Sequence, residues 1–193
     1  MHEIRVHGRG GQGAVLASLI LARAARREGR FVQAFPEFGV ERRGAPVSAF
    51  LRLDERPILI RSRIASPDHL LVLDPRLLEV SSTWEGLRSG GSLVINLGRA
   101  AGASPLKEWE PLILSQSWKV FGVEASSLAA GLGIGSPTAP VANTAMAGAF
   151  VKATGLFRLD SVLEAIRETV PEDREKNVQA ANEAYEKTRP LVT

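Results

Sequence analysis

The sequence predicts an α/β fold: one three-layer domain spanning residues 1–193, with a mixed, mostly parallel sheet. Short apolar runs alternate with segments of helical periodicity along most of the chain, which is typical of βαβ units. A glycine-rich turn links the first run to the first helical segment, as in a Rossmann-like N-terminal βαβ unit. Alternating apolar and polar side chains over 47–60 predict a β-hairpin insertion.

The N-terminal half supplies the βαβ unit and the hairpin. Because one helix separates the first two strands, we expect them to pair in parallel through a right-handed crossover. Gly29 follows the last helical residues and is expected to end that helix. In chain order the expected elements are strand 3–7, helix 13–28, strand 31–35, loop 36–46, strand 47–53, turn 54–57 and strand 58–60.

The C-terminal half returns to alternating strands and helices. Small residues on several faces of the segment 138–154 predict a helix that approaches its neighbours closely. No linker, repeat or low-complexity tract interrupts the chain. In chain order the expected elements are strand 70–73, short helix 75–80, a helix from Thr83 to near Gly90, strand 93–96, loop 98–116, a last strand 119–123, helix 126–131, helix 138–154, helix 161–170 capped by Asp160, and helix 171–189.

Composition narrows the function classes. Zero cysteines exclude disulfides and thiolate-held iron–sulfur clusters on this chain. His2, His7 and His69 have no metal-ligand spacing, so we expect no metal site and structural or surface roles for all three. The net charge is only +3, the arginines are scattered and aromatic residues make up 6%, so no nucleic-acid partner is expected. Without a signal peptide or an apolar run long enough for a membrane span, we expect a cytoplasmic protein with no membrane contact.

The turn Gly8-Arg9-Gly10-Gly11-Gln12-Gly13 has the spacing of a dinucleotide-binding turn. It would place backbone N–H groups and a helix N-terminus at the carboxyl edge of the sheet, which suits a phosphate. A dinucleotide site also needs an acidic residue at the end of the second strand, where Gln33 and Ala34 stand, and the first acid is Glu37 in the loop. NAD(P) binding, another anion and a purely structural turn remain open. The candidate phosphate contacts are Gly10, Gly11, Gln12 and Gly13.

The loop 36–46 is the second candidate site. It follows the second strand and is expected to emerge at the same edge as the glycine turn. The adjacent Arg42 and Arg43 are suited to a phosphate or to a partner's carboxylate. A solvated loop with internal salt bridges to Glu37 and Glu41 explains the same residues equally well.

Catalytic machinery is not evident in the sequence. No histidine pairs with a serine or an aspartate in a known motif, and the glycine turn lacks a P-loop lysine. Asp74 at a strand end is a possible general base, but an Asp-Pro pair is more often a helix cap. Asn143 is expected to satisfy backbone or partner groups, and Asn177 to lie on the surface or in a contact. We therefore predict no catalytic residues.

Four motifs together resemble a known family. They are the glycine turn with Gln12, the Arg43-Gly44 loop before an alternating strand, Asp54-Glu55-Arg56-Pro57-Ile58, and Ala142-Asn143-Thr144-Ala145-Met146-Ala147-Gly148. In this combination and order the chain resembles, from residue 3 to about 187, the gamma subunit of 2-oxoacid:ferredoxin oxidoreductases. Ala45 departs from the family, which commonly has a second glycine there.

The resemblance implies a non-catalytic subunit of a complex that oxidatively decarboxylates a 2-oxoacid such as pyruvate to an acyl-CoA. It implies alpha, beta and delta (ferredoxin-like) partner subunits, with ferredoxin or flavodoxin as electron acceptor. Thiamine diphosphate and iron–sulfur clusters would reside on those partners, and no cofactor on this chain. Gly10 to Gly13, Arg42 and Arg43 would then be candidate contacts to coenzyme A phosphates or to a partner. The alternative is a free-standing Rossmann-type nucleotide-binding oxidoreductase.

Overall fold

The computed structural model describes residues 1–37, 44–98, 106 and 109–192. Its centre is a seven-stranded sheet in the order β2-β3-β1-β4-β5-β6-β9. β1, β4, β5 and β6 are parallel, whereas β3 and β9 run antiparallel to their neighbours. The strands are β1 (His2–Arg9), β2 (Phe31–Glu37), β3 (Pro46–Asp54), β4 (His69–Val72), β5 (Ser92–Asn96), β6 (Lys119–Val123) and β9 (Arg189–Pro190), with β7 (Gly135–Ser136) and β8 (Ala139–Pro140) forming a separate hairpin.

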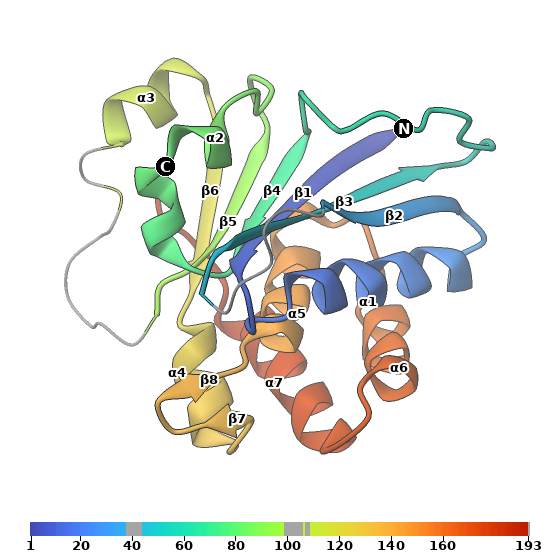
Figure 1. Ribbon diagram of the computed structural model, residues 1–193, viewed down its shortest axis with the longest axis vertical. Helices are drawn as coiled ribbons and strands as arrows, with labels where there is room; N and C mark the ends of the chain where they lie inside the picture. Colours follow the sequence, from blue (N-terminus) through green and yellow to red (C-terminus); the bar gives the residue numbers. More distant parts are fainter. Residues whose placement is uncertain (38–43, 99–105, 107–108, 193) are drawn as a thin grey trace.

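Helices lie on both faces of this sheet, which confirms the predicted three-layer α/β class. One layer contains α1, α5, α6 and α7, and the other contains η1, α2 and α3 (Figure 1). The helices are α1 (Ala14–Arg27), η1 (Pro75–Glu79), α2 (Ser81–Trp84), α3 (Glu110–Ser115), α4 (Ala125–Gly131), α5 (Asn143–Thr154), α6 (Leu159–Thr169) and α7 (Arg174–Lys187). No helix in the described part of the chain is long and apolar enough to cross a bilayer.

The larger hydrophobic core lies between the sheet and the layer that contains α5. As predicted from its small residues, α5 packs closely: a Cβ on Gly148 would lie 2.0 Å from the carbonyl oxygen of Ala181 in α7. A second core fills the opposite side around η1, α2 and α3, where Trp84 and Trp109 pack edge to face at 5.4 Å. The sheet is therefore covered by an alanine-rich layer on one side and a tryptophan-containing layer on the other.

The predicted parallel pairing of the first two strands is wrong. β3 lies between them and pairs antiparallel with both β1 and β2. The antiparallel hairpin of the sheet is thus β2–β3, whereas the prediction paired 47–53 with 58–60. Residues 58–60 form no strand because both edges of β3 are already occupied.

Several short elements also differ from the predictions. Periodicity is weak in short or small-residue segments, so tertiary contacts decide where these elements begin and end. The differences are α2 ending at Trp84 instead of near Gly90, α3 lying within the predicted loop 98–116, the strands β7, β8 and β9 following the predicted last strand, α5 beginning at Asn143, α6 beginning at Leu159 so that Asp160 lies in its first turn, and α7 beginning at Arg174.

Candidate functional site

The glycine turn lies at the carboxyl end of β1, as the sequence predicts. Gly11 and Gly13 have φ values of +94° and +78°, a left-handed conformation that side chains disfavour. Gln12 closes the turn on itself, because its Oε1 accepts a hydrogen bond from the Arg9 N–H at 2.7 Å. Its backbone N–H also donates to the Arg9 carbonyl at 2.9 Å. The turn is thus held in shape by its own residues.

An internal carboxylate lies where this turn meets the next parallel strand. Asp74 follows β4 and is only 3% exposed. Its Oδ2 accepts hydrogen bonds from Arg9 Nε at 2.9 Å and from Gln12 Nε2 at 3.3 Å. Its Oδ1 accepts from the Arg76 backbone N–H at 3.1 Å and caps η1. Since β1 and β4 are the neighbours between which the strand order reverses, Asp74 lies at the topological position where sheets of this kind commonly bind ligands.

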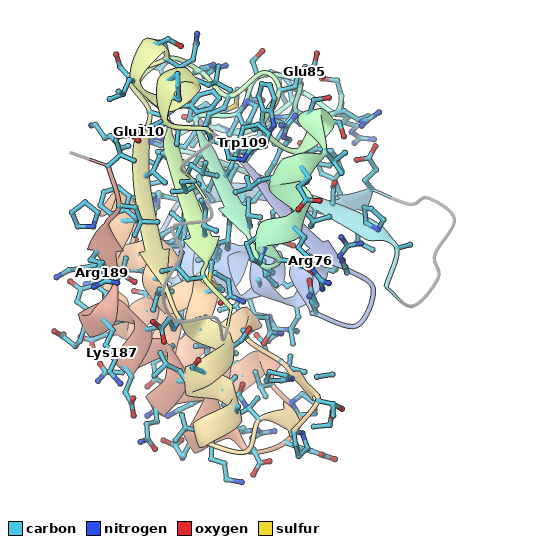
Figure 2. All side chains as sticks on the ribbon, turned by 90° about the vertical axis from the view of Figure 1, so that its left-hand side faces the viewer. Arg76, Glu85, Trp109, Glu110, Lys187 and Arg189 are labelled. Carbon is cyan, nitrogen blue, oxygen red and sulfur yellow. The ribbon has the colours of Figure 1, made fainter. Side chains whose placement is uncertain are left out.

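Two arginines flank this carboxylate and control its charge. Burial raises the pKa of Asp74. The hydrogen bonds and charge of Arg76, together with the hydrogen bond from Arg9, lower it by more, so the pKa lies below its ordinary value. The Asp74 carboxylate in turn raises the pKa of Arg76. Arg76 is exposed and projects outward from η1 (Figure 2). Asp74 is therefore held ionised as the cap of η1, and the cluster carries a net charge of +1.

The loop after β2 reaches the turn at its described end, which confirms that the two candidate segments share one edge. The Gly10 N–H donates to the Ala45 carbonyl at 2.8 Å, and the Gly44 N–H donates to the Gly10 carbonyl at 3.2 Å. Arg9 Nη1 also donates to the Gly44 carbonyl at 3.2 Å. Arg42 and Arg43 lie outside the described residues.

Close packing against α5 is a second reason why position 13 requires glycine. A Cβ at this position would lie 2.3 Å from Nδ2 of Asn143, the first residue of α5. Asn143 Oδ1 accepts a hydrogen bond from the Thr144 N–H at 2.8 Å, in agreement with its predicted role. Of the two alternatives for Asn177 the surface one is wrong: its side chain is buried in the contact between α7 and α5, where it accepts from Thr144 Oγ1 at 2.8 Å. The third glycine therefore allows α1 and α5 to meet.

Among the residues that the structure describes, no acidic one lies beside the glycine turn at the position where a dinucleotide site needs one, at the end of its second strand. The end of β2 is separated from β1 by β3, so an acid there could not stand beside the turn as it does in a Rossmann unit. Glu37, at that end, forms an ion pair with Arg63. The turn is thus compatible with an anion but not with the full dinucleotide fingerprint.

A second charged region, which the sequence reading missed, covers one side of β1–β3. We call this side the outer face; it carries Glu3, Arg5, His7, Phe50 and Arg52, opposite the side packed against α1. Arg52 is 1% exposed and donates to Glu3 Oε1 at 2.9 Å, and Arg5 donates to three backbone carbonyls, among them Thr83 at 3.0 Å. The signal was present as the alternation Glu3-Ile4-Arg5-Val6-His7.

The outer face borders a cavity of about 100 Å³, in which apolar residues line the wall together with Arg5, His7, Glu37, Ser48 and Arg63. His7 Nδ1 is 3.2 Å from Ser48 Oγ. His7 Nε2 and Arg5 Nε are buried and form no hydrogen bond with the described residues. Burial, followed by the charge of Arg5, lowers the pKa of His7 to about 3, so the ring is neutral at physiological pH.

Metal ligands do not gather in the described part of the chain, where no three histidine, cysteine, aspartate or glutamate side chains could hold an ion together. His2 and His69 stack at 5.8 Å, and His69 also packs edge to face on Phe150 at 5.9 Å. Both contacts are structural, in line with the prediction for the histidines.

Fold and turn together define a Rossmann-like α/β module in which Asp74, just after β4, accepts hydrogen bonds from Arg9 and Gln12 of the glycine turn. The family model described as pyruvate ferredoxin/flavodoxin oxidoreductase matches residues 3–187. The "Pyruvate/ketoisovalerate oxidoreductases common subunit gamma" of Thermococcus kodakarensis is 48% identical, with 97% of each chain covered. The "Pyruvate synthase subunit PorC" of Methanothermobacter marburgensis is 43% identical, with 98% of each covered.

Solved structures agree with this assignment. The pyruvate oxidoreductase subunit PORC of Thermotoga maritima superposes with a TM-score of 0.77 at 32% identity, and 98% of each chain is covered. The chain also matches, in fold alone, 30% of the length of a 2-oxoglutarate:ferredoxin oxidoreductase chain from Magnetococcus marinus, with a TM-score of 0.66 and 16% identity. The chain belongs to the pyruvate ferredoxin/flavodoxin oxidoreductase family.

Proposed function

We propose that the chain is the gamma subunit of a multi-subunit 2-oxoacid:ferredoxin oxidoreductase. That complex would convert a 2-oxoacid such as pyruvate, with coenzyme A, to an acyl-CoA and CO₂ while it reduces ferredoxin or flavodoxin. The observation that carries the proposal is the match of nearly the whole chain to gamma and PorC subunits at 43–48% identity. Because these relatives have almost the same length, the likeness concerns a whole subunit.

Within the complex the chain has a structural role and no catalytic groups of its own. The strand-end carboxylate Asp74 is an ion-paired helix cap, and His7 is buried and neutral. With zero cysteines the chain has no thiolates for iron–sulfur clusters. Thiamine diphosphate and the clusters belong to the alpha, beta and delta subunits of the complex, which also select the 2-oxoacid.

The glycine turn is the part of this subunit that borders the coenzyme A path. Its support is the net positive charge that Arg9 and Arg76 leave around Asp74 and the backbone of Gly10 to Gly13 at a helix N-terminus. Arg42 and Arg43 belong to the loop that joins this edge. These residues bind phosphate groups of coenzyme A or a partner's carboxylate, with guanidinium groups suited to both.

A free-standing nucleotide-binding oxidoreductase is the weaker alternative. The acid that would bind a ribose hydroxyl is missing, and β3 separates the end of β2 from the turn. Micromolar binding of NAD(P) or a flavin to the isolated chain would favour this alternative.

Co-expression with the neighbouring subunit genes tests the proposal. A tagged chain is expected to co-purify with subunits that contain thiamine diphosphate and iron–sulfur clusters. The complex is expected to reduce ferredoxin with pyruvate or another 2-oxoacid and coenzyme A, whereas the isolated chain is inactive. A lone chain that oxidises a 2-oxoacid, or a tagged chain that captures none of these subunits, would contradict it.

The coenzyme A role has its own test in the assembled complex. Replacing Arg42 and Arg43 with alanine is expected to raise the KM for coenzyme A about tenfold or more, with little change in kcat, because two charge-assisted hydrogen bonds are lost. Arg26→Ala, at the exposed end of α1, is the matched control and should leave KM unchanged. Equal KM values in both variants would remove the phosphate role and keep the subunit assignment.

A further inference from the structure

We infer that the exposed segment 57–62, together with Val80, is the docking surface for another subunit of the same complex, and that this partner presents a carboxylate side chain within an apolar surface. The inference rests on the proposed function, because it requires that the chain works within a complex. It assigns the contact to the outer face of β1–β3 and not to the glycine turn.

The segment is apolar and open to solvent. Leu59 is 87% exposed and Ile60 is 46% exposed, and Val80 at the end of η1 is 44% exposed. Figure 1 shows the segment as the teal loop that leaves β3 and passes the N-terminus. Arg63 and Val80 line the same cavity, which brings the end of this loop and η1 together on one surface. Large apolar side chains gathered on one surface are typical of protein contacts.

The backbone of the segment is also unpaired. Residues 57–62 form no hydrogen bond with any residue that the structure describes. The loop is fixed only at its two ends: the Arg56 N–H donates to Asp54 Oδ1 at 3.1 Å, and the Arg63 carbonyl accepts from Arg52 at 3.4 Å. Backbone groups without a partner in their own chain can be satisfied by groups of another subunit.

The arginines beside the apolar segment indicate the charge of the partner's surface. Arg56 and Arg61 border the apolar residues and have no ion pair with the described residues. The neighbouring cavity is lined by Arg5 and by the largely exposed Arg63, which pairs with Glu37. A carboxylate that docks beside the segment would accept hydrogen bonds from Arg56 or Arg61. These arginines and the apolar residues that they border therefore favour an acidic side chain flanked by apolar ones.

The test uses the complex purified through a tag on this chain. Leu59→Asp and Val80→Asp each place a charge in the contact and are expected to lower the recovery of partner subunits about tenfold or more. Leu114→Asp is the matched control, because Leu114 is 58% exposed on α3, away from the outer face. Circular dichroism and thermal unfolding of the isolated variants should match wild type, since these side chains contribute little to its core.

A photo-crosslinking residue at position 59 identifies the occupant. The expected adduct is a peptide of another subunit with aspartate or glutamate among apolar residues. Wild-type recovery with both Leu59→Asp and Val80→Asp, equal loss with Leu114→Asp, or a crosslink to a second copy of this chain would overturn the inference. If wild type itself captures no partner subunits, the proposed function fails instead, so the two failures are distinguishable.

Discussion

The two sides of β1–β3 are built from the same strands but by different physical means. The inner side presents Ile4, Val6 and Leu51 to α1 and is held by apolar burial. The outer face presents Glu3, Arg5 and Arg52 instead, and these side chains are buried as ion pairs and hydrogen bonds.

The difference shows which side the chain completes by itself. On the inner side the apolar residues of β1 and β3 pack against α1 and are fully buried within the chain. On the outer face the charged residues pair, but buried polar atoms of Arg5 and His7 find no partner in the described residues, and the loop above them exposes Leu59. Both sides therefore contribute to stability, but of the two only the outer face has buried polar atoms that find no partner in the described residues.

Breaking the buried ion pair of the outer face gives the largest expected effect. Arg52→Met leaves the Glu3 carboxylate with only the half-exposed Arg88 as partner and is expected to cost about 3 kcal/mol of unfolding free energy. Adding Glu3→Met should recover most of that loss, because an apolar pair carries no uncompensated charge. Denaturant unfolding of the single and double variants measures both.

A surface ion pair provides the control for this comparison. Arg167→Met removes the exposed ion pairs with Glu175 and Glu164 and should lower the unfolding free energy far less than Arg52→Met does, because solvent screens exposed pairs. If Arg52→Met costs no more than this control, the buried network does not stabilise the outer face.

Packing on the inner side is tested by Gly148→Ala. The added Cβ would meet the Ala181 carbonyl oxygen at 2.0 Å and push α5 and α7 apart, which we expect to cost about 2 kcal/mol or more. Gly131→Ala in α4 meets no atom within 4 Å and should be neutral or stabilising, since alanine favours a helix. Equal thermal stabilities of the two variants would show that the helices can separate freely.

Lowering the pH is expected to destabilise the outer face through the buried side chain of His7. Its pKa is lowered to about 3 in the folded chain, so between pH 6.5 and 3 the unfolded chain binds the extra proton and stability falls as pH falls. We expect a loss of about 2 kcal/mol between pH 7 and pH 5 from this residue. His7→Asn, which does not titrate, should flatten the dependence, as measured by unfolding at each pH. His69, with a pKa lowered to about 4 by burial, contributes in the same direction and remains in the variant.

The smallest loss of stability is expected at Asp74, beside the glycine turn. Asp74→Asn keeps an acceptor for the Arg76 N–H but removes the negative charge between Arg9 and Arg76, at a cost of about 1 kcal/mol. Phosphate should then raise the melting temperature of the variant more than that of wild type. Identical shifts would show that the turn does not hold an external anion even when its own carboxylate is neutralised.

Local patterns in the sequence predicted the elements well but not their order across the sheet. The turn, α1 with its stop at Gly29, and the small-residue helix α5 follow from spacing and composition. The place of β3 between β1 and β2 does not, because alternation defines a strand's two faces and not its neighbours. Residues 58–60 are apolar enough for a strand and lack only a free edge.

For the candidate site, too, the sequence predicted the local features but not the contacts between distant residues. The glycine turn and the absence of an acid after the second strand could be read from the glycine spacing and from Gln33 and Ala34. The contact of Gln12 with Asp74 joins residues 62 positions apart, and no local signal announces it. The alternation of charges in β1 did signal the outer face, since a strand that is charged at every second position must satisfy those charges when buried.

Both borders of the sheet contain proline. β2 contains Pro36 at one border and β9 ends with Pro190 at the other, and proline has no N–H for a further strand. Sheet extension from subunit to subunit is therefore disfavoured at these borders. In a complex, each sheet would end within its own chain, so that subunits could be exchanged or rearranged without breaking a shared ladder of backbone hydrogen bonds.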